Sequence, residues 1–245
     1  MKILSFVVAL TILGLTTAAH AETFGFATNG TSYNLFLFPD STYTGASGIN
    51  NSGQIVGVYV DQDYVVHGFL KDGDLYTSLD HPGSIYTSAV GINNVGQIVG
   101  VFTNRDGAAA GFLKDGNNFI EITYPNAYFS DAAGINDAGQ VIGSYKDSDV
   151  TLQGVGWHGY VMDRNGYTRI DYPNSKNSEA SGISNSGRIV GYFWDPDGES
   201  TRGFLKDGTV YSPFDVPDAA FSSTYPLAIN NAGRILVYTP GTSYL

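Results

Sequence analysis

Short apolar runs alternate with glycine-rich polar turns along the chain, in five near-copies of one pattern. Each copy opens with a phrase in which a small residue, Ile and Asn lead through a turn into an apolar run, as in GINNSGQIVG from Gly48. The other copies of this phrase begin at Gly91, Gly134, Gly182 and Ala228, at spacings of 43 to 48 residues. A period of this size, rich in turn residues, is typical of a repeat architecture such as a propeller or a solenoid.

A second phrase, GFLKDG or a variant of it, alternates with the first. Its copies begin at Gly25, Gly68, Gly111, Gly159 and Gly203. Asn-x-Gly and Asp-Gly between apolar runs predict hairpin turns, because Gly and Asn accept the positive φ that such turns need. In the unit spanning residues 44–86 the pattern predicts a strand through residues 46–47 and strands at 54–60, 65–70 and 75–80. Beyond the first residues of the chain, no stretch holds a helical period with caps.

Four antiparallel strands per unit, in five units, predict an all-β fold, and specifically a five-bladed β-propeller. The strand containing Ile55 and Val56 is apolar on both faces, as expected where blades stack face to face. The chain ends with the first half of a unit (residues 227–238), and residues 24–38 are the second half of one. We expect these halves to form a closing blade shared by the two termini, which removes exposed sheet edges.

The first 21 residues have the features of a signal peptide. Lys2 gives a positive start, residues 3–15 are a short apolar run, and Ala19-His20-Ala21 is a small-x-small cleavage site. The apolar run is too short for a membrane span. We therefore expect cleavage after Ala21, secretion to the periplasm or the cell exterior, no insertion into a membrane, and a propeller domain spanning residues 22–245.

Charge and composition narrow the range of partners. The chain has 23 Asp and Glu against 12 Lys and Arg, a formal net charge of −11, which argues against binding to nucleic acid. The same charge is compatible with neutral sugars, cations or basic proteins as ligands. It is equally compatible with acidic residues that serve only to keep the protein soluble. Because the sequence contains no Cys, an exported fold is held by its core and strand pairing rather than by disulfides. We expect a monomer with one core.

The alternation of the two phrases resembles the extracellular HAF-repeat family of secreted bacterial proteins. The likeness is clearest at His67-Gly68-Phe69-Leu70 and covers nearly all of the mature chain. The first residue of the second phrase varies at the other sites, which have Phe24, Ala110, His158 and Arg202. The resemblance implies export and a repeat β fold, and it brings no catalytic residues to transfer.

Departures from the repeat indicate a ligand site. The only two Trp residues fall in equivalent long connections of consecutive units, which places them on one rim. Aromatic faces cover the apolar side of a pyranose, and carboxylates accept hydrogen bonds from sugar hydroxyls. We therefore predict a glycan site at the junction of the third and fourth blades, on the side opposite the short turns. Its predicted residues are Trp157, His158, Trp194, Asp195, Asp197 and Arg202.

Repeated positions add to this prediction. Tyr43 and Tyr86 stand beside hydroxyl residues that precede the first strands, and we include both Tyr residues as candidate ligand contacts. These hydroxyl residues are Thr44, Thr87, Ser130, Ser178 and Thr224. The structural alternative is that such hydroxyls and the Asp turns cap their own backbone, and that the two Trp residues are core. We expect no cofactor. Bound Ca²⁺ stays open as an alternative, because Asp195, Asp197 and Glu199 offer hard oxygen ligands at alternate positions.

Three functions remain open on the sequence. A secreted module that binds extracellular glycan or another surface ligand is favoured, since by blade count the architecture is similar to five-bladed lectins of the tachylectin type. The first alternative is a structural or adhesive repeat protein without a small ligand. The second is a hydrolase or lyase with an acidic site on the long-connection face. Against catalysis, the sequence has no nucleophile elbow and no His pair at metal-ligand spacing, so no catalytic residue is assigned.

Overall fold

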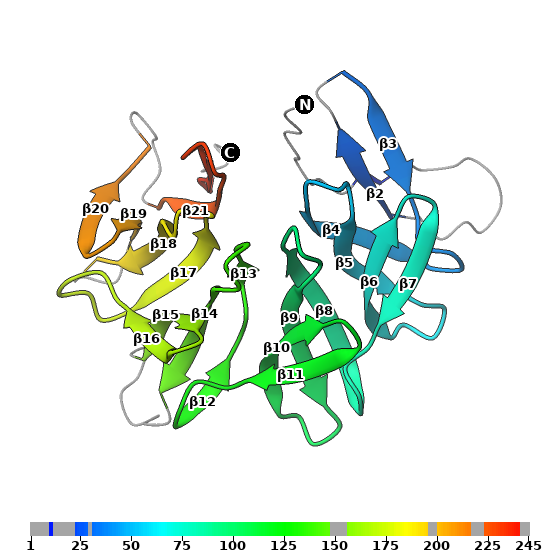
Figure 1. Ribbon diagram of the computed structural model, residues 1–245, viewed down its shortest axis with the longest axis horizontal. Helices are drawn as coiled ribbons and strands as arrows, with labels where there is room; N and C mark the ends of the chain where they lie inside the picture. The colour runs from blue at the N-terminus through cyan, green and yellow to red at the C-terminus, as the bar shows by residue number, and fades with distance from the viewer. Residues whose placement is uncertain are drawn as a thin grey trace, which may run out of the picture. The chain divides into compact units, whose positions relative to one another are not determined.

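The computed structural model describes most of the chain as β-structure. The described residues are 10–11, 23–28, 31–147, 156–195, 200–216 and 223–240. Within them the fold is all-β, as the repeat pattern predicts (Figure 1). The chain divides into two compact units, Met1–Glu121 and Ile122–Leu245, and each is described by itself. The predicted signal peptide lies outside the described residues except for β1 (Leu10–Thr11), so its cleavage stays a prediction.

The first unit is a series of antiparallel hairpins. Its strands are β1, β2 (Thr23–Thr28), β3 (Tyr33–Phe36), β4 (Tyr43–Ile49), β5 (Ile55–Val60), β6 (Val66–Asp72), β7 (Leu75–Leu79), β8 (Ser84–Ile92), β9 (Ile98–Asn104), β10 (Ala109–Asp115) and β11 (Asn118–Ile122). We call β4–β7 the first repeat sheet and β8–β11 the second. Single parallel pairs, between β2 and β4 and between β6 and β8, link these groups into one continuous sheet.

The second unit repeats the same hairpins in separate sheets. Its strands are β12 (Ala127–Ser130), β13 (Gly134–Ile135), β14 (Val141–Asp147), β15 (Trp157–Asp163), β16 (Gly166–Ile170), β17 (Ser178–Ile183), β18 (Ile189–Trp194), β19 (Thr201–Asp207), β20 (Val210–Phe214), β21 (Tyr225–Ile229) and β22 (Ile235–Tyr238). We call β12–β16 the third repeat sheet and β17–β20 the fourth. Strands β21 and β22 form a two-stranded sheet.

The glycine at the end of the first phrase lies where two strands of a repeat sheet approach closely. A Cβ atom on Gly57 would overlap the carbonyl oxygen of Gly45, and one on Gly191 would overlap that of Glu179. The added atom on Gly191 would also lie 2.6 Å from the ring of Phe204. Neither position leaves room for a methyl group. These glycines therefore mark positions where neighbouring strands approach closely.

The glycine of the second phrase allows consecutive sheets to stack. A Cβ atom on Gly68 would lie 3.4 Å from the backbone nitrogen of Ala89, and one on Gly159 would lie 3.3 Å from the Cβ atom of Ala180. Ala89 and Ala180 are both buried at these contacts. The small residues of the first strands therefore serve sheet stacking within each unit.

In the first repeat sheet, an Asn side chain organises the short turn of the first phrase and ties it to the next sheet. The Oδ1 atom of Asn50 accepts hydrogen bonds from the backbone N–H groups of Ser52 (3.1 Å) and Gln54 (3.0 Å). Its Nδ2 atom donates to the carbonyl oxygen of Asn93 in the second repeat sheet, 3.2 Å away. One side chain thus satisfies two backbone N–H groups of its own turn and adds a second bond to the carbonyl oxygen of Asn93, which also accepts the N–H of Gly96.

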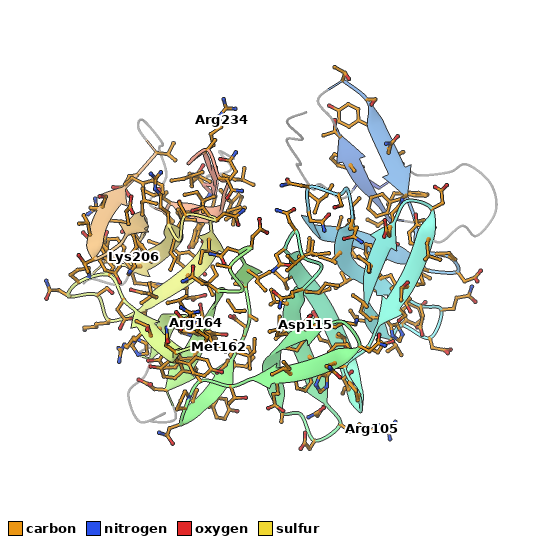
Figure 2. The ribbon with its side chains drawn as sticks, in the orientation of Figure 1. Arg105, Asp115, Met162, Arg164, Lys206 and Arg234 are labelled. Atoms are coloured by element: carbon orange, nitrogen blue, oxygen red, sulfur yellow. The ribbon has the colours of Figure 1, made fainter. Side chains whose placement is uncertain are left out.

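The two ends of each repeat sheet differ in their connections. The side chain of Gln54 in the first short turn donates to Asp72 in the second short turn, with 2.9 Å between Nε2 and Oδ2. Both short turns therefore share one end of the sheet, as predicted, and the long connections leave from the other. In Figure 2, Asp115 and Arg105 mark these two ends in the second repeat sheet.

The core of each unit is built from the apolar residues of both phrases. Val56 and Phe112 have no exposed surface in the first unit, and Ile142 and Phe204 have none in the second. Burial of side chains of this size stabilises the fold by about 1.5 to 3 kcal/mol each. The repeated phrases therefore supply the packing energy as well as the turns.

The sheet of β21 and β22 departs from this pattern. Leu227 is 48% exposed and Leu236 is 39% exposed, whereas the equivalent residue of Leu236 in the first repeat sheet, Val56, is fully buried. This half-unit therefore presents apolar surface that the complete repeat sheets cover. Its completion by the N-terminal strands stays a prediction.

Candidate functional site

The long-connection end of the fourth repeat sheet is closed by an aromatic stack. The ring of Tyr172 lies on the ring of Phe193, with 3.8 Å between centroids and 6° between planes. The backbone N–H of Tyr172 donates to the hydroxyl of Ser178, 3.0 Å away, and Ser178 is fully buried. The same bond joins Phe38 to Thr44 in the first unit (2.9 Å). These repeated hydroxyls are capping groups, as the structural alternative held, and they are not open to a ligand.

In the first repeat sheet, a His residue is held between two carboxylates. His67 Nε2 lies 3.2 Å from Asp61 Oδ2, and Nδ1 lies 2.8 Å from Asp80 Oδ1. Burial lowers the pKa of His67, but the hydrogen bonds to both carboxylates outweigh it and raise the pKa above its ordinary value. The other oxygen of Asp61 accepts the N–H groups of Asp63 and Val65, so Asp61 also caps its own turn.

The predicted site residue His158 is the equivalent residue in the third repeat sheet. Its side chain is only 7% exposed, and its ring nitrogens lie 3.1 Å from Asp147 and 3.1 Å from Asp171. Arg169 binds Asp171 and places Nη2 2.7 Å from His158 Nδ1. His158 is therefore buried behind partly exposed polar partners, and its ring presents little surface at the rim.

The two Trp residues are bridged by one Asn. The side-chain oxygen of Asn177 accepts the backbone N–H of Trp157 (3.1 Å), and its carbonyl oxygen accepts that of Trp194 (3.2 Å). The Trp157 ring packs edge-on against Phe129, with 5.8 Å between centroids, and the Trp194 ring lies 5.4 Å from Tyr192. Both indoles are half-buried. The structure thus brings the two backbones together and gives the rings different surroundings.

Arg202 lies on the other face of the fourth repeat sheet. It pairs with Asp215 at 2.9 Å, and its guanidinium lies 5.9 Å from the ring of Phe193. Phe193 and Trp194 are consecutive strand residues and point to opposite faces, so Arg202 does not share a face with Trp194. Asp195 follows Trp194 and accepts a hydrogen bond from Ser200 Oγ, 2.7 Å away.

The remaining predicted residues lie elsewhere in the chain. Tyr43 is half-buried in the first unit, where its hydroxyl fills the space beside Gly45. Tyr86 is 39% exposed, in the first strand of the second repeat sheet. Asp197 lies outside the described residues. None of these three residues is placed beside Trp194 by the described structure.

An aromatic group with one carboxylate occupies the face of the fourth repeat sheet that carries Trp194. The ring of Tyr192 lies 5.1 Å from that of Tyr225 at 74°, and Tyr225 lies 6.3 Å from Tyr238. The hydroxyl of Tyr192 donates to Glu179 Oε2, 2.8 Å away. We call Glu179, Tyr192, Trp194, Tyr225 and Tyr238 the Tyr192 cluster. Tyr238 is 54% exposed and the others are half-buried, so the cluster reaches the surface.

Burial perturbs the carboxylates of this region. Burial raises the pKa of Glu179, and the hydrogen bond from Tyr192 opposes the rise only in part. Asp131 occupies the equivalent position in the third repeat sheet. Burial raises the pKa of Asp131 to about 6, the N–H of Ser144 opposes the rise, and the charge of Glu179 adds to it. The two carboxylates are therefore near enough to repel each other, and their charge is incompletely compensated.

A buried hydroxyl shares this face. Thr201 lies opposite Trp194 in the register of β18 and β19 and is 3% exposed. Among the described residues, its Oγ1 atom has no hydrogen-bond partner, although its backbone N–H donates to Ser223 Oγ. Leaving a buried hydroxyl unpaired costs about 1 to 3 kcal/mol. The hydroxyl is enclosed by the described structure, so it is not open to a ligand at the surface of the cluster.

Most of the cluster was missed by sequence reasoning, which searched the long connections for departures from the repeat and not the strands. Glu179 and Tyr192 face each other across β17 and β18. The same cross-strand pair in the second repeat sheet is Ser88 and Val101. Aligning the strand positions of the repeats would have shown a carboxylate and an aromatic ring at two positions that are small or apolar in the first two repeat sheets.

The described structure holds no sign of a metal centre. Within the described ranges, no group of three or more His, Cys, Asp or Glu side chains is placed to hold a metal ion. The run considered for Ca²⁺ continues from Asp195 to Asp197 and Glu199, which lie outside the described residues. In the part of the chain that the structure covers, no helix is long and apolar enough to cross a membrane.

Comparison with known proteins supports the fold. No protein-family model matches the chain, and no curated protein matches its sequence. The β-propeller domain of the Trilobed protease from Pyrococcus furiosus is similar in structure, with a TM-score of 0.61 and 12% identity over 94% of this chain and 77% of that chain. AofleA from Arthrobotrys oligospora has a TM-score of 0.54 and 10% identity, over 91% of this chain and 74% of that one.

A third similar structure is that of the SapL1 lectin in complex with alpha methyl fucoside. Its TM-score is 0.51 at 12% identity, over 97% of this chain and 88% of that chain. At such low identities the likeness shows the fold alone. The chain therefore has an all-β fold similar to that of β-propeller proteins.

Proposed function

We propose that this chain is a secreted β-propeller that binds carbohydrate through the Tyr192 cluster. The observation that carries the proposal is an aromatic surface that shares one sheet face with a carboxylate. Tyr238, Tyr225 and Trp194 offer ring faces for the apolar side of a sugar ring. Glu179 offers carboxylate oxygens that accept hydrogen bonds from sugar hydroxyls.

The fold is compatible with this function but does not select it. One of the similar structures is a lectin solved with a fucoside, and another is a domain of a protease. One fold hosts many functions, so the argument for carbohydrate rests on the residues of the cluster. The structural or adhesive alternative has no comparable group of residues in its support.

We further propose that the four repeat sheets are four blades, and that β21–β22 and β2–β3 together form a fifth. The exposed Leu236 of β22 and the exposed Leu35 of β3 support this proposal, since both are apolar residues on incomplete hairpins. In the first repeat sheet Val56 pairs with Leu70. By the repeat, Leu236 would pair with Ala27.

Closure is tested by an engineered disulfide, because the chain has no Cys of its own. The variant Ala27→Cys/Leu236→Cys should form an intramolecular disulfide in the folded protein, detected by mass spectrometry. The control Tyr33→Cys/Leu236→Cys moves one Cys from β2 to β3, which by the repeat does not lie next to β22, and should stay reduced. Failure of the first pair to cross-link in the folded protein would contradict the closing blade.

Carbohydrate binding is tested with the chain that begins at Glu22 on a panel of immobilised glycans, with and without Ca²⁺. We expect binding to at least one glycan and a loss of several-fold or more in the variant Trp194→Ala, because a stacked aromatic contributes about 1 kcal/mol beyond its burial. Absence of binding to every glycan would overturn the proposal in favour of a structural role. Secretion is tested by the N-terminal residue of exported protein, which we expect to be Glu22.

A further inference from the structure

We propose that the Tyr192 cluster prefers glycans that carry a protonated amine over neutral glycans. The inference rests on the proposed carbohydrate function and names the ligand class of the same site. It is carried by the juxtaposition of the Glu179 carboxylate with the rings of Tyr192 and Tyr225, on the half-buried face that carries Trp194.

Among the described residues, no Lys, Arg or His forms an ion pair with Glu179. One carboxylate oxygen accepts the hydroxyl of Tyr192, and this neutral donor leaves the charge in place. The Arg side chains paired in the described part of this unit bind other carboxylates. These pairs are Arg169 with Asp171, Arg188 with Asp207 and Arg202 with Asp215. A half-buried carboxylate without a counter-ion costs free energy that a ligand ammonium group would recover.

The rings around Glu179 favour the same ligand. An ammonium group over an aromatic face is attracted by the ring quadrupole, and the attraction grows when the site is partly dehydrated. Tyr192 and Tyr225 stand at 74° to each other, so they present two differently oriented faces beside one carboxylate. A neutral sugar hydroxyl gains stacking and ordinary hydrogen bonds here, whereas an ammonium group gains a charge-assisted hydrogen bond as well.

The negative charge around the cluster also fits an amino sugar. Asp131 and Asp195 add negative charge near the cluster. With a formal net charge of −11, the whole chain also attracts cations over longer distances.

The test compares two oligosaccharides that differ only at the amine, the hexamer of glucosamine and the hexamer of N-acetylglucosamine. The dissociation constants are measured by calorimetric titration at near-physiological salt. The wild-type chain should bind the glucosamine hexamer about tenfold more tightly, because one charge-assisted hydrogen bond contributes a difference in affinity of about this size. In the variant Glu179→Gln, the ratio of the two dissociation constants should fall close to one. The variant Asp63→Asn removes the same charge from an exposed turn of the first repeat sheet and should keep the wild-type ratio.

Each outcome decides the inference. Equal binding of the two hexamers by the wild type would overturn the preference and leave the carbohydrate function intact. Equal loss of the ratio in both variants would also overturn it, because general attraction by the acidic chain would then explain the preference. If the wild type binds neither hexamer but binds another neutral glycan, the preference is wrong and the carbohydrate function stands. If it binds no glycan on the panel, the proposed function fails with the inference.

Discussion

The second and fourth repeat sheets have the same framework and different chemistry. Gly100 in one and Gly191 in the other each make room for the carbonyl oxygen of the neighbouring strand. The cross-strand pair beside that glycine is Ser88 with Val101 in the second sheet, and Glu179 with Tyr192 in the fourth. The repeat therefore fixes the positions that determine strand approach, and it leaves the adjacent positions free to acquire function.

The largest expected effect breaks the framework that both sheets share. Gly100→Ala and Gly191→Ala should each lower the free energy of unfolding by about 3 kcal/mol or more, because the added methyl group overlaps backbone. Chemical denaturation measures this loss. The matched control is Gly96→Ala, whose Cβ would meet open space at φ +86°, so only the strain of about 1 to 2 kcal/mol for the left-handed conformation applies. A loss at Gly191 no larger than that at Gly96 would contradict the close approach.

The free energy of unfolding should depend on pH through a buried carboxyl of the second unit that has no counterpart in the second repeat sheet. The pKa of Asp131 is raised to about 6 by burial, whereas the second sheet has the neutral Ser88 at this position. A carboxyl whose pKa is raised by folding favours the folded state at low pH, and this contribution is lost as the pH rises through about 6. Asp131→Asn keeps an acceptor for the N–H of Ser144 and should remove that loss.

The variant should therefore match the wild type in stability near pH 4. At pH 7 it should be more stable by on the order of 2 kcal/mol. Thermal unfolding across this pH range provides the measurement. Parallel pH profiles of wild type and variant would show that Asp131 is not the responsible group.

A smaller effect concerns the short turns, where the fourth sheet has Ser184 in place of Asn. In the second sheet the side chain of Asn93 accepts two backbone N–H groups, those of Val95 and Gln97. In the fourth sheet the side chain of Ser184 accepts one of the two equivalent groups, the N–H of Arg188. Asn93→Ala should cost about 1 to 2 kcal/mol, and Asn93→Ser should cost less because one acceptor remains. Melting temperatures of the two variants test the order, and equal losses would contradict it.

The fold was largely predictable from the sequence because comparing the repeats within one chain shows which positions recur. Turn residues recur where the chain must reverse, and Gly57 and its equivalents recur where strands approach, so both are visible in one chain. The site was less predictable. Trp194 was identified as a departure from the repeat, but its neighbour Tyr192 contacts Glu179 and Tyr225 from other strands, and only the folded structure shows these contacts. His158 was expected at an open rim, but it lies buried between Asp147 and Asp171, which come from other segments of the third repeat sheet.

The most direct test converts the fourth sheet into the second. The variant Glu179→Ser/Tyr192→Val/Trp194→Thr installs the residues found at the equivalent positions, Ser88, Val101 and Thr103, and leaves the glycine framework untouched. Glycan binding and thermal unfolding are measured on the same preparation. We expect binding to be lost while the cooperative unfolding transition is retained. Undiminished glycan binding by the folded variant would contradict the assignment of the Tyr192 cluster as the glycan site.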